Sequence, residues 1–192
     1  MNLAIFLLVI LNFLYIGLLP VVFFKRDGRL NALWWLTAAP FVLCISFITM
    51  SFIGCLSLFF GSHSFWNRVI ALFAIPINVG SIALISFTLG CHRIPIALWH
   101  QTNDAPQQIV TWGAYKYVRH PFYTAFLLAF LGAFLYCPQV GTLFTLVYGC
   151  FILNTTADKE EKRLLSSDLG SDYTNYMAIT GRFIPIWGRK AK

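Results

Sequence analysis

The chain has 192 residues, of which 58% are hydrophobic and 11% are charged, and its formal net charge at pH 7 is +7. Soluble domains carry about 25% charged residues, and a chain of this length has too small a core to bury this much apolar side chain. The composition therefore excludes an ordinary soluble domain and indicates an integral membrane protein.

Four long stretches contain no Asp, Glu, Lys or Arg: residues 1–24, 30–67, 69–92 and 120–157. A helix needs about 20 apolar residues to cross the hydrocarbon core of a bilayer. We therefore predict an all-α fold, a polytopic membrane helix bundle. The first stretch is interpreted as a true span over residues 3–24. A cleaved signal peptide is disfavoured, because no cation precedes Lys25 and the apolar run is too long.

The second and third stretches supply the next two spans. Span two lies within residues 32–60, where Pro40 is expected to begin or kink the helix near one end. Residues 61–68 are expected to form the outer turn. Span three covers residues 69–90 and is interrupted by Pro76.

The fourth stretch predicts a tight helical hairpin. Apolar residues run from Phe122 to Tyr136 and, after the turn sequence CPQVG, on to Leu153. Each limb holds about 15 residues, which is short for a full crossing. The hairpin is therefore expected either to be thin, with limbs shorter than a full crossing, or to extend beyond the hydrocarbon core at its cytoplasmic ends.

The segments on either side of the hairpin are polar. Residues 91–112 are too irregular to face lipid with unpaired backbone groups, so we expect a cytoplasmic or interfacial loop. The tail begins as a helix, with one apolar-aromatic face and a break near Gly170. The chain thus divides into N-terminal spans (1–90) and a C-terminal unit (91–192), which holds the loop, the hairpin (122–157) and the tail (158–192).

The cations predict the topology. With about five spans and the N-terminus outside, thirteen of the fourteen Lys and Arg residues fall on the cytoplasmic face, and Arg68 alone does not. This distribution follows the positive-inside bias. The positive charge is therefore interpreted as a signal of membrane topology. We expect the lipid bilayer as a partner and do not expect binding to nucleic acid. The five cysteines show no spacing typical of a metal site, and we predict no metal and no disulfide.

Two polar segments should meet where the hairpin ends. A tight hairpin brings its own ends together, so Arg119, His120 and Tyr123 are expected near the acidic residues of the sequence DKEEKR, which starts at Asp158. Ionisable groups beside a membrane indicate a functional site by default. Two ordinary interpretations remain open: tyrosines and cations at a span end are common interfacial anchors, and a charged helix end is often a solvated face.

The sequence GAYKYVRHPFYTAF (residues 113–126) resembles the G-x-Y-[KR]-x-[VI]-R-H-P-x-Y segment of the isoprenylcysteine carboxyl methyltransferase family. The sequence EEKRLLSSDLGSDYTNYMAITGRFIP (residues 160–185) is similar to the closing motif of that family. Phospholipid N-methyltransferases and some membrane sterol reductases share a related architecture. The resemblance implies an integral membrane methyltransferase with a cytoplasmic pocket for S-adenosyl-L-methionine, and the chain has no glycine-rich loop for a soluble alternative.

The resemblance also implies site residues. Carried over by motif, the catalytic residues are Glu161, Arg119 and Arg182. Either arginine is a candidate partner for the cofactor's carboxylate, and Glu161 for its ribose or sulfonium. The cofactor-binding residues are Tyr117, Val118, Arg119, His120, Pro121, Tyr123, Glu160, Glu161, Tyr173, Tyr176, Arg182 and Pro185.

The acceptor implied is a lipidic or prenylated small molecule such as a prenylcysteine carboxylate. A phospholipid amine, a membrane lipid or sterol reductase activity, and a non-catalytic scaffold or transporter remain alternatives. The chain departs from the family at Ala157, where an arginine often stands four residues before the motif glutamate, and this puts a catalytic Arg–Glu pair in doubt. The membrane is the plasma membrane in a prokaryote or the endoplasmic reticulum in a eukaryote, and the sequence leaves the oligomeric state open.

Overall fold

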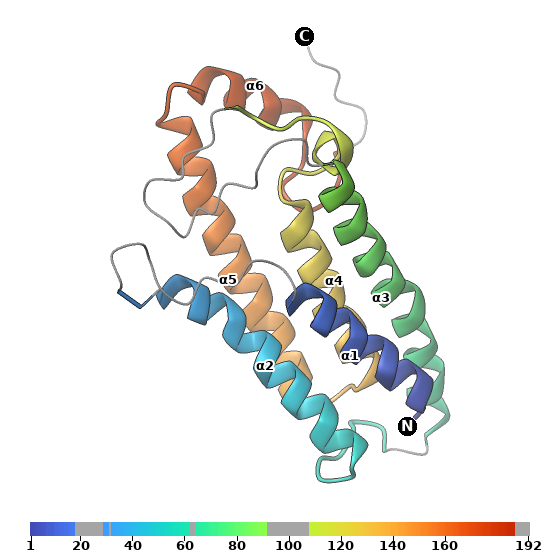
Figure 1. The fold of residues 1–192 in the computed structure, drawn as a ribbon. Coiled ribbons are helices and arrows are strands. Elements are labelled where there is room, and N and C mark those ends of the chain that lie inside the picture. Colours follow the sequence, from blue (N-terminus) through green and yellow to red (C-terminus); the bar gives the residue numbers. More distant parts are fainter. Residues whose placement is uncertain (18–28, 31, 62–63, 92–107, 187–192) are drawn as a thin grey trace.

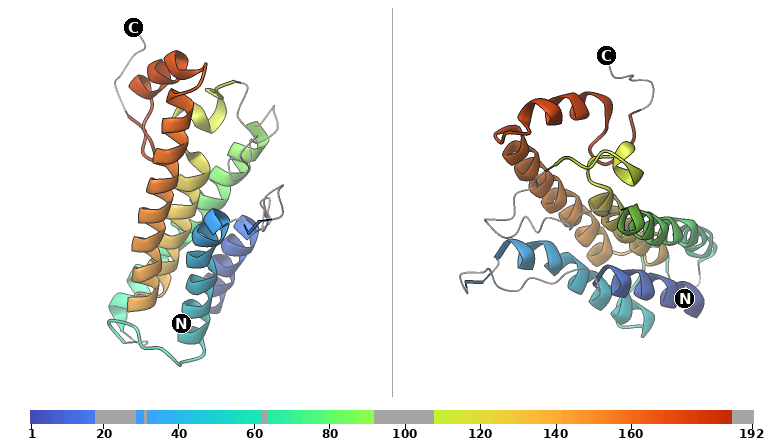
Figure 2. Two further views of the ribbon diagram at one scale, coloured as in Figure 1. Left: turned by 90° about the vertical axis from the view of Figure 1, so that its left-hand side faces the viewer. Right: turned by 45° about the horizontal axis from the view of Figure 1, so that its top comes forward.

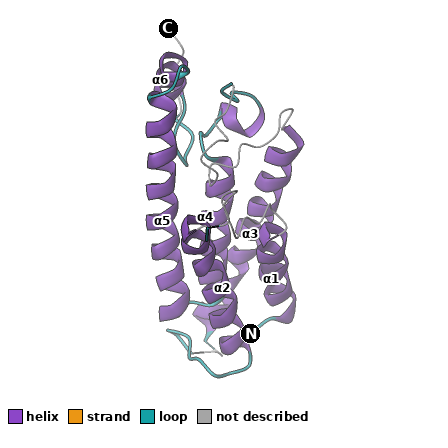
Figure 3. Ribbon diagram, turned by 60° about the vertical axis from the view of Figure 1, so that its left-hand side comes forward, coloured by secondary structure: helices purple, strands orange, loops and turns teal. Residues whose placement is uncertain are grey.

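The computed structural model describes residues 1–17, 29–30, 32–61, 64–91 and 108–186, and every regular element in them is helical (Figure 3). In chain order, the elements are α1 (Leu3–Gly17), α2 (Ala32–Phe52), α3 (Phe65–Cys91), the 3₁₀ turn η1 (Gly113–Lys116), α4 (Pro121–Tyr136), α5 (Val140–Leu165) and α6 (Gly170–Ile179). The predicted helical membrane bundle is confirmed.

Among the described residues, three helices are long and apolar enough to cross a membrane: α2, α3 and α5. The helices α1 and α4 are apolar but shorter. Span one was predicted over residues 3–24, and α1 accounts for residues 3–17 of it, while residues 18–24 lie outside the described residues. The five spans and their orientation stay predictions. Most of the predicted loop at 91–112 also lies outside the described residues.

The sequence analysis was wrong about a helix start at Pro40, about an interruption at Pro76 and about the extent of the outer turn, whereas a kink at Pro40 stays a prediction. The helix α2 starts well before Pro40, and α3 continues through Pro76 without interruption. A proline removes one helical hydrogen bond, but ending a helix in an apolar medium leaves several backbone groups without partners, so continuation costs less. The helix α3 begins inside the predicted turn, because the Ser64 hydroxyl accepts from the Trp66 N–H at 3.2 Å and acts as its N-cap.

The hairpin is confirmed and is extended at one end. The helix α5 has 26 residues and continues past the apolar stretch into the charged sequence, so its C-terminal turns carry Glu160 and Glu161. Its start is set by Gln139, whose side chain accepts from the Gly141 N–H while the Thr142 hydroxyl accepts from the Gln139 N–H. These bonds satisfy backbone donors that the helix itself leaves free. Gly170 begins α6, at the break predicted there.

The helices pack around one aromatic centre. The helix α4 lies along α3, α1 packs on α3, and α2 packs on α5 (Figure 1). The ring of Phe130 on α4 is fully buried and meets Phe13 of α1 and Phe41 of α2, with ring centroids 5.7 and 4.6 Å apart. Gly149 lets α5 approach the same ring, because a Cβ there would lie 2.9 Å from it. The helix α6 lies at the end of the bundle opposite the N-terminus (Figure 2).

A buried polar network joins α1, α3 and α4. The Asn12 amide donates to Asn78 Oδ1 at 2.9 Å, and Ser81 Oγ lies 3.2 Å from Asn12 Oδ1 and 2.8 Å from the Ala125 carbonyl oxygen. All three polar side chains are fully buried. Small residues and interhelical hydrogen bonds let membrane helices approach closely, and Gly132 of α4 lies directly against Asn78.

This contact predicts that Gly132→Ala destabilises the bundle. The new Cβ would lie 2.8 Å from Asn78 Cγ, so the network must shift, at a cost of about 1–3 kcal/mol. The matched control is Gly80→Ala on α3, where nothing lies within 4 Å of the new Cβ. Thermal unfolding in detergent measures both variants. Equal melting temperatures for the two would contradict the close contact.

Candidate functional site

The two polar motifs are joined first by their backbones. The Arg119 N–H donates to the Gly181 carbonyl at 2.8 Å, and the His120 N–H donates to the Arg182 carbonyl at 3.1 Å. These bonds accompany a parallel bridge between Val118 and Gly181. The segment before α4 and the segment after α6 therefore run side by side, and the side chains of Arg119, His120 and Arg182 come to the same place.

The 3₁₀ turn before this segment is held against the end of α3. Gly113 has a φ of +62°, a conformation that L side chains rarely adopt, and a Cβ there would clash with Cys91. The Trp112 indole N–H donates to the Cys91 carbonyl at 2.9 Å. The glycine that opens the first motif is thus required by the backbone and by close packing.

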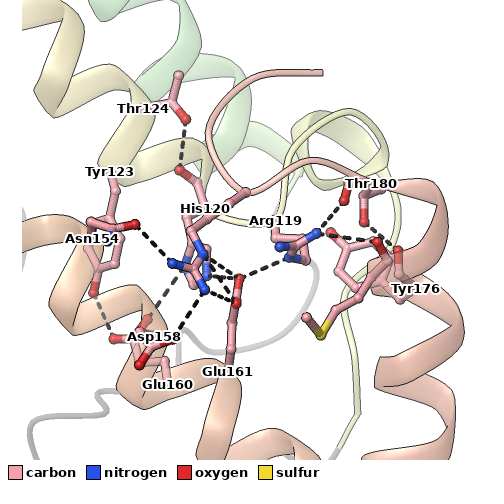
Figure 4. Close-up of polar contacts among 12 residues, drawn as sticks. Arg119, His120, Tyr123, Thr124, Asn154, Asp158, Glu160, Glu161, Tyr176 and Thr180 are labelled. Atoms are coloured by element: carbon pink, nitrogen blue, oxygen red, sulfur yellow. Dashed lines mark hydrogen bonds and ion pairs between the residues drawn. The ribbon is translucent and has the colours of Figure 1, made fainter. Parts of the chain in front are cut away.

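The centre of the site is the carboxylate of Glu161, with 3% of its side chain exposed (Figure 4). Arg119 Nε donates to its Oε1 at 2.9 Å, and Arg182 Nη2 donates to its Oε2 at 2.5 Å. Arg182 Nε lies 3.2 Å from both oxygens, and His120 Nε2 lies 3.2 Å from Oε1. One buried anion therefore holds groups from both motifs.

A second acidic residue, Glu160, extends the cluster. The Tyr123 hydroxyl donates to Glu160 Oε1 at 2.7 Å, and His120 Nδ1 lies 3.6 Å from Oε2. The rings of His120 and Tyr123 are stacked, with centroids 5.4 Å apart. His120 thus lies between the two carboxylates, with one ring nitrogen toward each of them.

The two carboxyl groups differ in acidity, and both lie beyond the charge-free part of α5, which ends at Ala157. Burial acts to raise the pKa of Glu161, but hydrogen bonds from His120, Arg182 and Arg119 outweigh it and lower that pKa to about 2. Burial raises the pKa of Glu160 above its ordinary value, against the opposing effects of Tyr123 and His120. Glu161 is accordingly a fixed anion, and Glu160 is the more readily protonated of the two.

The arginines also contact groups that the sequence analysis did not single out. Arg182 Nη1 donates to Asn154 Oδ1 at 2.9 Å, and Nη2 lies 3.4 Å from Asp158 Oδ1. Arg119 Nη1 donates to the Thr180 carbonyl. Asn154 lies seven residues before Glu161, two turns along α5, so helical spacing from the glutamate was the signal that would have found it.

The remaining predicted residues have different places. Tyr173 and Tyr176 are buried on α6 with ring centroids 5.9 Å apart, and the Tyr176 hydroxyl donates to the Tyr115 carbonyl at 2.6 Å. Val118 is buried and Pro121 is the first residue of α4. Two predicted residues lie apart from the cluster in the described structure: Tyr117, with 57% of its surface exposed, and Pro185, which is also exposed.

Ala157 does not leave Glu161 without an arginine. The alanine is fully buried on α5, one turn before the glutamate. Arg119 and Arg182 reach the carboxylate from the two segments that flank the hairpin and α6. Their guanidinium groups can therefore form the Arg–Glu pairs that the substitution had put in doubt.

The chemistry available at this site is recognition of a polar, charged molecule. Arg182 has 27% of its side chain exposed and Asp158 has 41%, whereas Glu161 is enclosed. A guanidinium fork suits a carboxylate or phosphate, and a carboxylate suits an ammonium group or hydroxyls. The exposed edge of the cluster therefore presents a positive group, Arg182, and a negative group, Asp158, while Glu161 beneath them is enclosed.

Residues 99–166 match the model of the isoprenylcysteine carboxyl methyltransferase (ICMT) family. The match covers 68 of the 192 residues, from the loop before η1 to the end of α5, and includes the first motif together with Glu160 and Glu161. It ends before α6 and Arg182. No curated protein and no solved structure matches the chain.

The geometry predicts that Glu161→Ala releases the tail. Without the carboxylate, two guanidinium groups lose their common anion, and removing one partner from a buried ion pair costs about 3 kcal/mol. The neighbouring change Lys162→Ala is the control, because the Lys162 side chain is 74% exposed and pairs with partly exposed Asp158 at 2.7 Å. We expect faster proteolytic cleavage within residues 166–186 for Glu161→Ala and no change for Lys162→Ala. Equal cleavage of Glu161→Ala and the unchanged protein would exclude the anchoring role.

Proposed function

We propose that the chain belongs to the isoprenylcysteine carboxyl methyltransferase family, whose model matches residues 99–166, and that it is a membrane-embedded, S-adenosylmethionine-dependent methyltransferase. Its acceptor is a lipidic or apolar molecule such as a prenylcysteine carboxylate. The observation that carries the proposal is the meeting of both motifs at the buried carboxylate of Glu161, at one end of an apolar helix bundle. A charged cofactor and a lipidic acceptor need such a boundary between a polar site and apolar helices.

The residues at the site fit the chemical groups of the cofactor. S-adenosylmethionine presents a carboxylate, an ammonium group, ribose hydroxyls and a sulfonium. Arg182 has the exposed guanidinium that suits the carboxylate. Asp158 suits the ammonium group or the hydroxyls, and tyrosine faces such as Tyr173 suit a cation. The donor set therefore contains a partner for each charged group.

We assign Glu161 a positioning role. Both of its oxygens already accept hydrogen bonds from arginines, so it has little capacity left for the cofactor's ribose. Its anion orients Arg119 and Arg182 and offsets their charge. Arg182 is then the residue whose free edge contacts the cofactor, with Asn154 and Asp158 beside it.

The bound cofactor supplies a methyl group activated by a positive sulfonium. A carboxylate acceptor loses no proton when it is methylated, so the protein's task is to bind, align and exclude water. Alignment of two reactants can supply several kcal/mol of the barrier. The backbone bonds that hold Arg119 and His120 against Gly181 and Arg182 give this end of the bundle the rigidity that alignment needs.

We place this site on the cytoplasmic side, in a chain of about five spans with the N-terminus outside. Thirteen of the fourteen cations then lie on the cytoplasmic face, as the positive-inside bias favours. The cofactor reaches the site from water, and the acceptor arrives through the bilayer.

Calorimetric titration of the detergent-purified protein with S-adenosylhomocysteine tests the cofactor. We expect micromolar binding that Arg182→Ala weakens roughly tenfold or more, because a charge-assisted hydrogen bond contributes about 1.5–3 kcal/mol. Lys159→Ala, which removes an exposed positive charge from α5, serves as the control and should bind as the unchanged protein does. Folded protein that shows no heat of binding would overturn the proposal.

The acceptor is tested separately, by transfer of a labelled methyl group from the cofactor. An S-farnesylcysteine derivative should be labelled, and the same molecule with its carboxylate amidated should not. Labelling of phosphatidylethanolamine in place of the prenylcysteine would keep the methyltransferase and reject the proposed acceptor.

A further inference from the structure

The imidazole of His120 lies between two carboxylates that are neighbours on α5 (Figure 4). Its Nε2 is 3.2 Å from Glu161 Oε1, and its Nδ1 is 3.6 Å from Glu160 Oε2. Only 10% of the His120 side chain and 13% of the Glu160 side chain are exposed. Water therefore has little access to replace a donor that one of these contacts lacks.

The number of protons at this place decides how many of the two contacts can form. A neutral imidazole has one N–H group, and an imidazolium has two. If both glutamates are ionised, a neutral His120 donates to one of them, and the other faces a ring nitrogen without a proton. One additional proton removes the conflict. On His120 it lets the ring donate to both carboxylates, and on Glu160 it donates to Nδ1 while Nε2–H donates to Glu161.

Glu160 is the carboxyl group of the cluster that can hold this proton. Burial opposes the ionisation of Glu161, but hydrogen bonds from His120 and both arginines lower its pKa to about 2. A hydrogen bond from Lys162 lowers the pKa of Asp158. Burial raises the pKa of Glu160 above its ordinary value of 4.5. Two groups this close titrate as one unit, so His120 and Glu160 share the proton.

Other charged and titratable groups face this pair from every neighbouring element. The Tyr123 hydroxyl donates to Glu160 Oε1 at 2.7 Å, which leaves Oε2 as the oxygen toward His120. The surrounding groups in the described residues are Tyr115 from η1, Tyr123 from α4, Glu161 and Arg163 from α5, Tyr173 from α6, and Arg119 and Arg182 from the flanking segments.

The position of His120 matters because this residue joins three parts of the fold. It directly precedes α4, its ring contacts α5, and its N–H donates to the Arg182 carbonyl at 3.1 Å. The ring of Phe183, from the same tail segment, lies 6.1 Å from the imidazole centroid to centroid. A change in the contacts of this ring is therefore transmitted to the junction between the hairpin and the tail.

We propose that Glu160 is a positioning residue that holds His120 toward Glu161 through one shared proton, so that closure of the junction between hairpin and tail depends on pH. When the proton leaves, one of the two contacts of His120 loses its donor and the junction opens more often. This device holds whether or not the chain transfers methyl groups. In a clause that rests on the proposed function, the protonated form is the one that keeps Arg119 and Arg182 in place for the cofactor.

The direction of the pH effect follows from the pKa of Glu160. A carboxyl group whose pKa is raised by folding binds its proton more tightly in the folded protein than in the unfolded chain. The proton therefore stabilises the closed junction at low pH. This contribution is lost as the pH rises from 4.5 through the raised pKa.

Backbone hydrogen exchange of the full chain in detergent, followed by mass spectrometry between pH 5 and pH 8, tests the proposal. The variant is Glu160→Gln, whose carboxamide can accept from Tyr123 and donate to His120 Nδ1 at every pH. At each pH, the exchange rate of residues 118–124 in the unchanged protein is divided by that in the variant, which cancels the intrinsic effect of pH. We expect a ratio near one at pH 5 that rises roughly threefold to tenfold by pH 8.

Two further variants separate the shared proton from a general loss of structure. Asp168→Asn makes the same chemical change at an exposed residue in the turn between α5 and α6, and it should exchange as the unchanged protein does at every pH. Tyr123→Phe removes a hydrogen bond that lowers the pKa of Glu160. The pH at which exchange accelerates should therefore move upward in Tyr123→Phe, whereas a mere loss of packing would accelerate exchange equally at every pH.

The proposal is overturned by a ratio for Glu160→Gln that stays constant between pH 5 and pH 8, or by the same rise for Asp168→Asn. A downward or absent shift in Tyr123→Phe also overturns it, and this variant decides the question if Glu160→Gln does not fold. The samples contain neither cofactor nor acceptor. Failure here therefore leaves the calorimetric test of the cofactor untouched, and failure of that test leaves this result standing.

Discussion

The buried carboxylate of Glu161 is the constraint on which the C-terminal half of the structure depends. An enclosed anion is costly unless cations and hydrogen bonds surround it, and the partners here come from two segments far apart in the chain. Arg119 precedes α4 and Arg182 follows α6. Satisfying this single group therefore requires the hairpin to close and the tail to fold back over its open end.

Backbone hydrogen bonds join the same two segments that the ion pairs connect. Two N–H to carbonyl bonds align residues 119–120 with residues 181–182. The helix α6 adds the buried Tyr176, whose hydroxyl donates to the Tyr115 carbonyl in the 3₁₀ turn. Charge pairs near water are weak when they stand alone, but these are partly enclosed and share one carboxylate. The result is a polar surface, held by hydrogen bonds and ion pairs, on a bundle whose other described helices are joined by aromatic packing and by a buried polar network.

Buried polar side chains within the bundle occur in two different arrangements. In its interior, Asn12, Asn78 and Ser81 satisfy one another and a backbone carbonyl, so they join helices without offering a free group to a ligand. At the end near α3's first turn, the buried Asn67 amide donates to the Gly61 carbonyl, and its Oδ1 has no partner among the described residues. A satisfied network stabilises contacts between helices, whereas a buried acceptor without a donor costs free energy.

The sequence by itself determined that the chain lies in a lipid bilayer, that its fold is helical, and at which end of the hairpin the candidate site lies. Long charge-free runs favour helices in lipid, because a helix pairs the backbone groups within its own segment. The CPQVG turn between two apolar limbs brings Arg119 and Glu161 to the same end. Only the tertiary structure decided that Glu161 is enclosed and that Glu160 pairs with Tyr123 instead of an arginine. It also decided that Arg182 pairs with Glu161 in spite of Ala157, and that Tyr117 is exposed. The continuation of α3 through Pro76 was likewise decided there. These features depend on contacts between residues tens of positions apart, whereas hydropathy and motif spacing report only local preference and order along the chain.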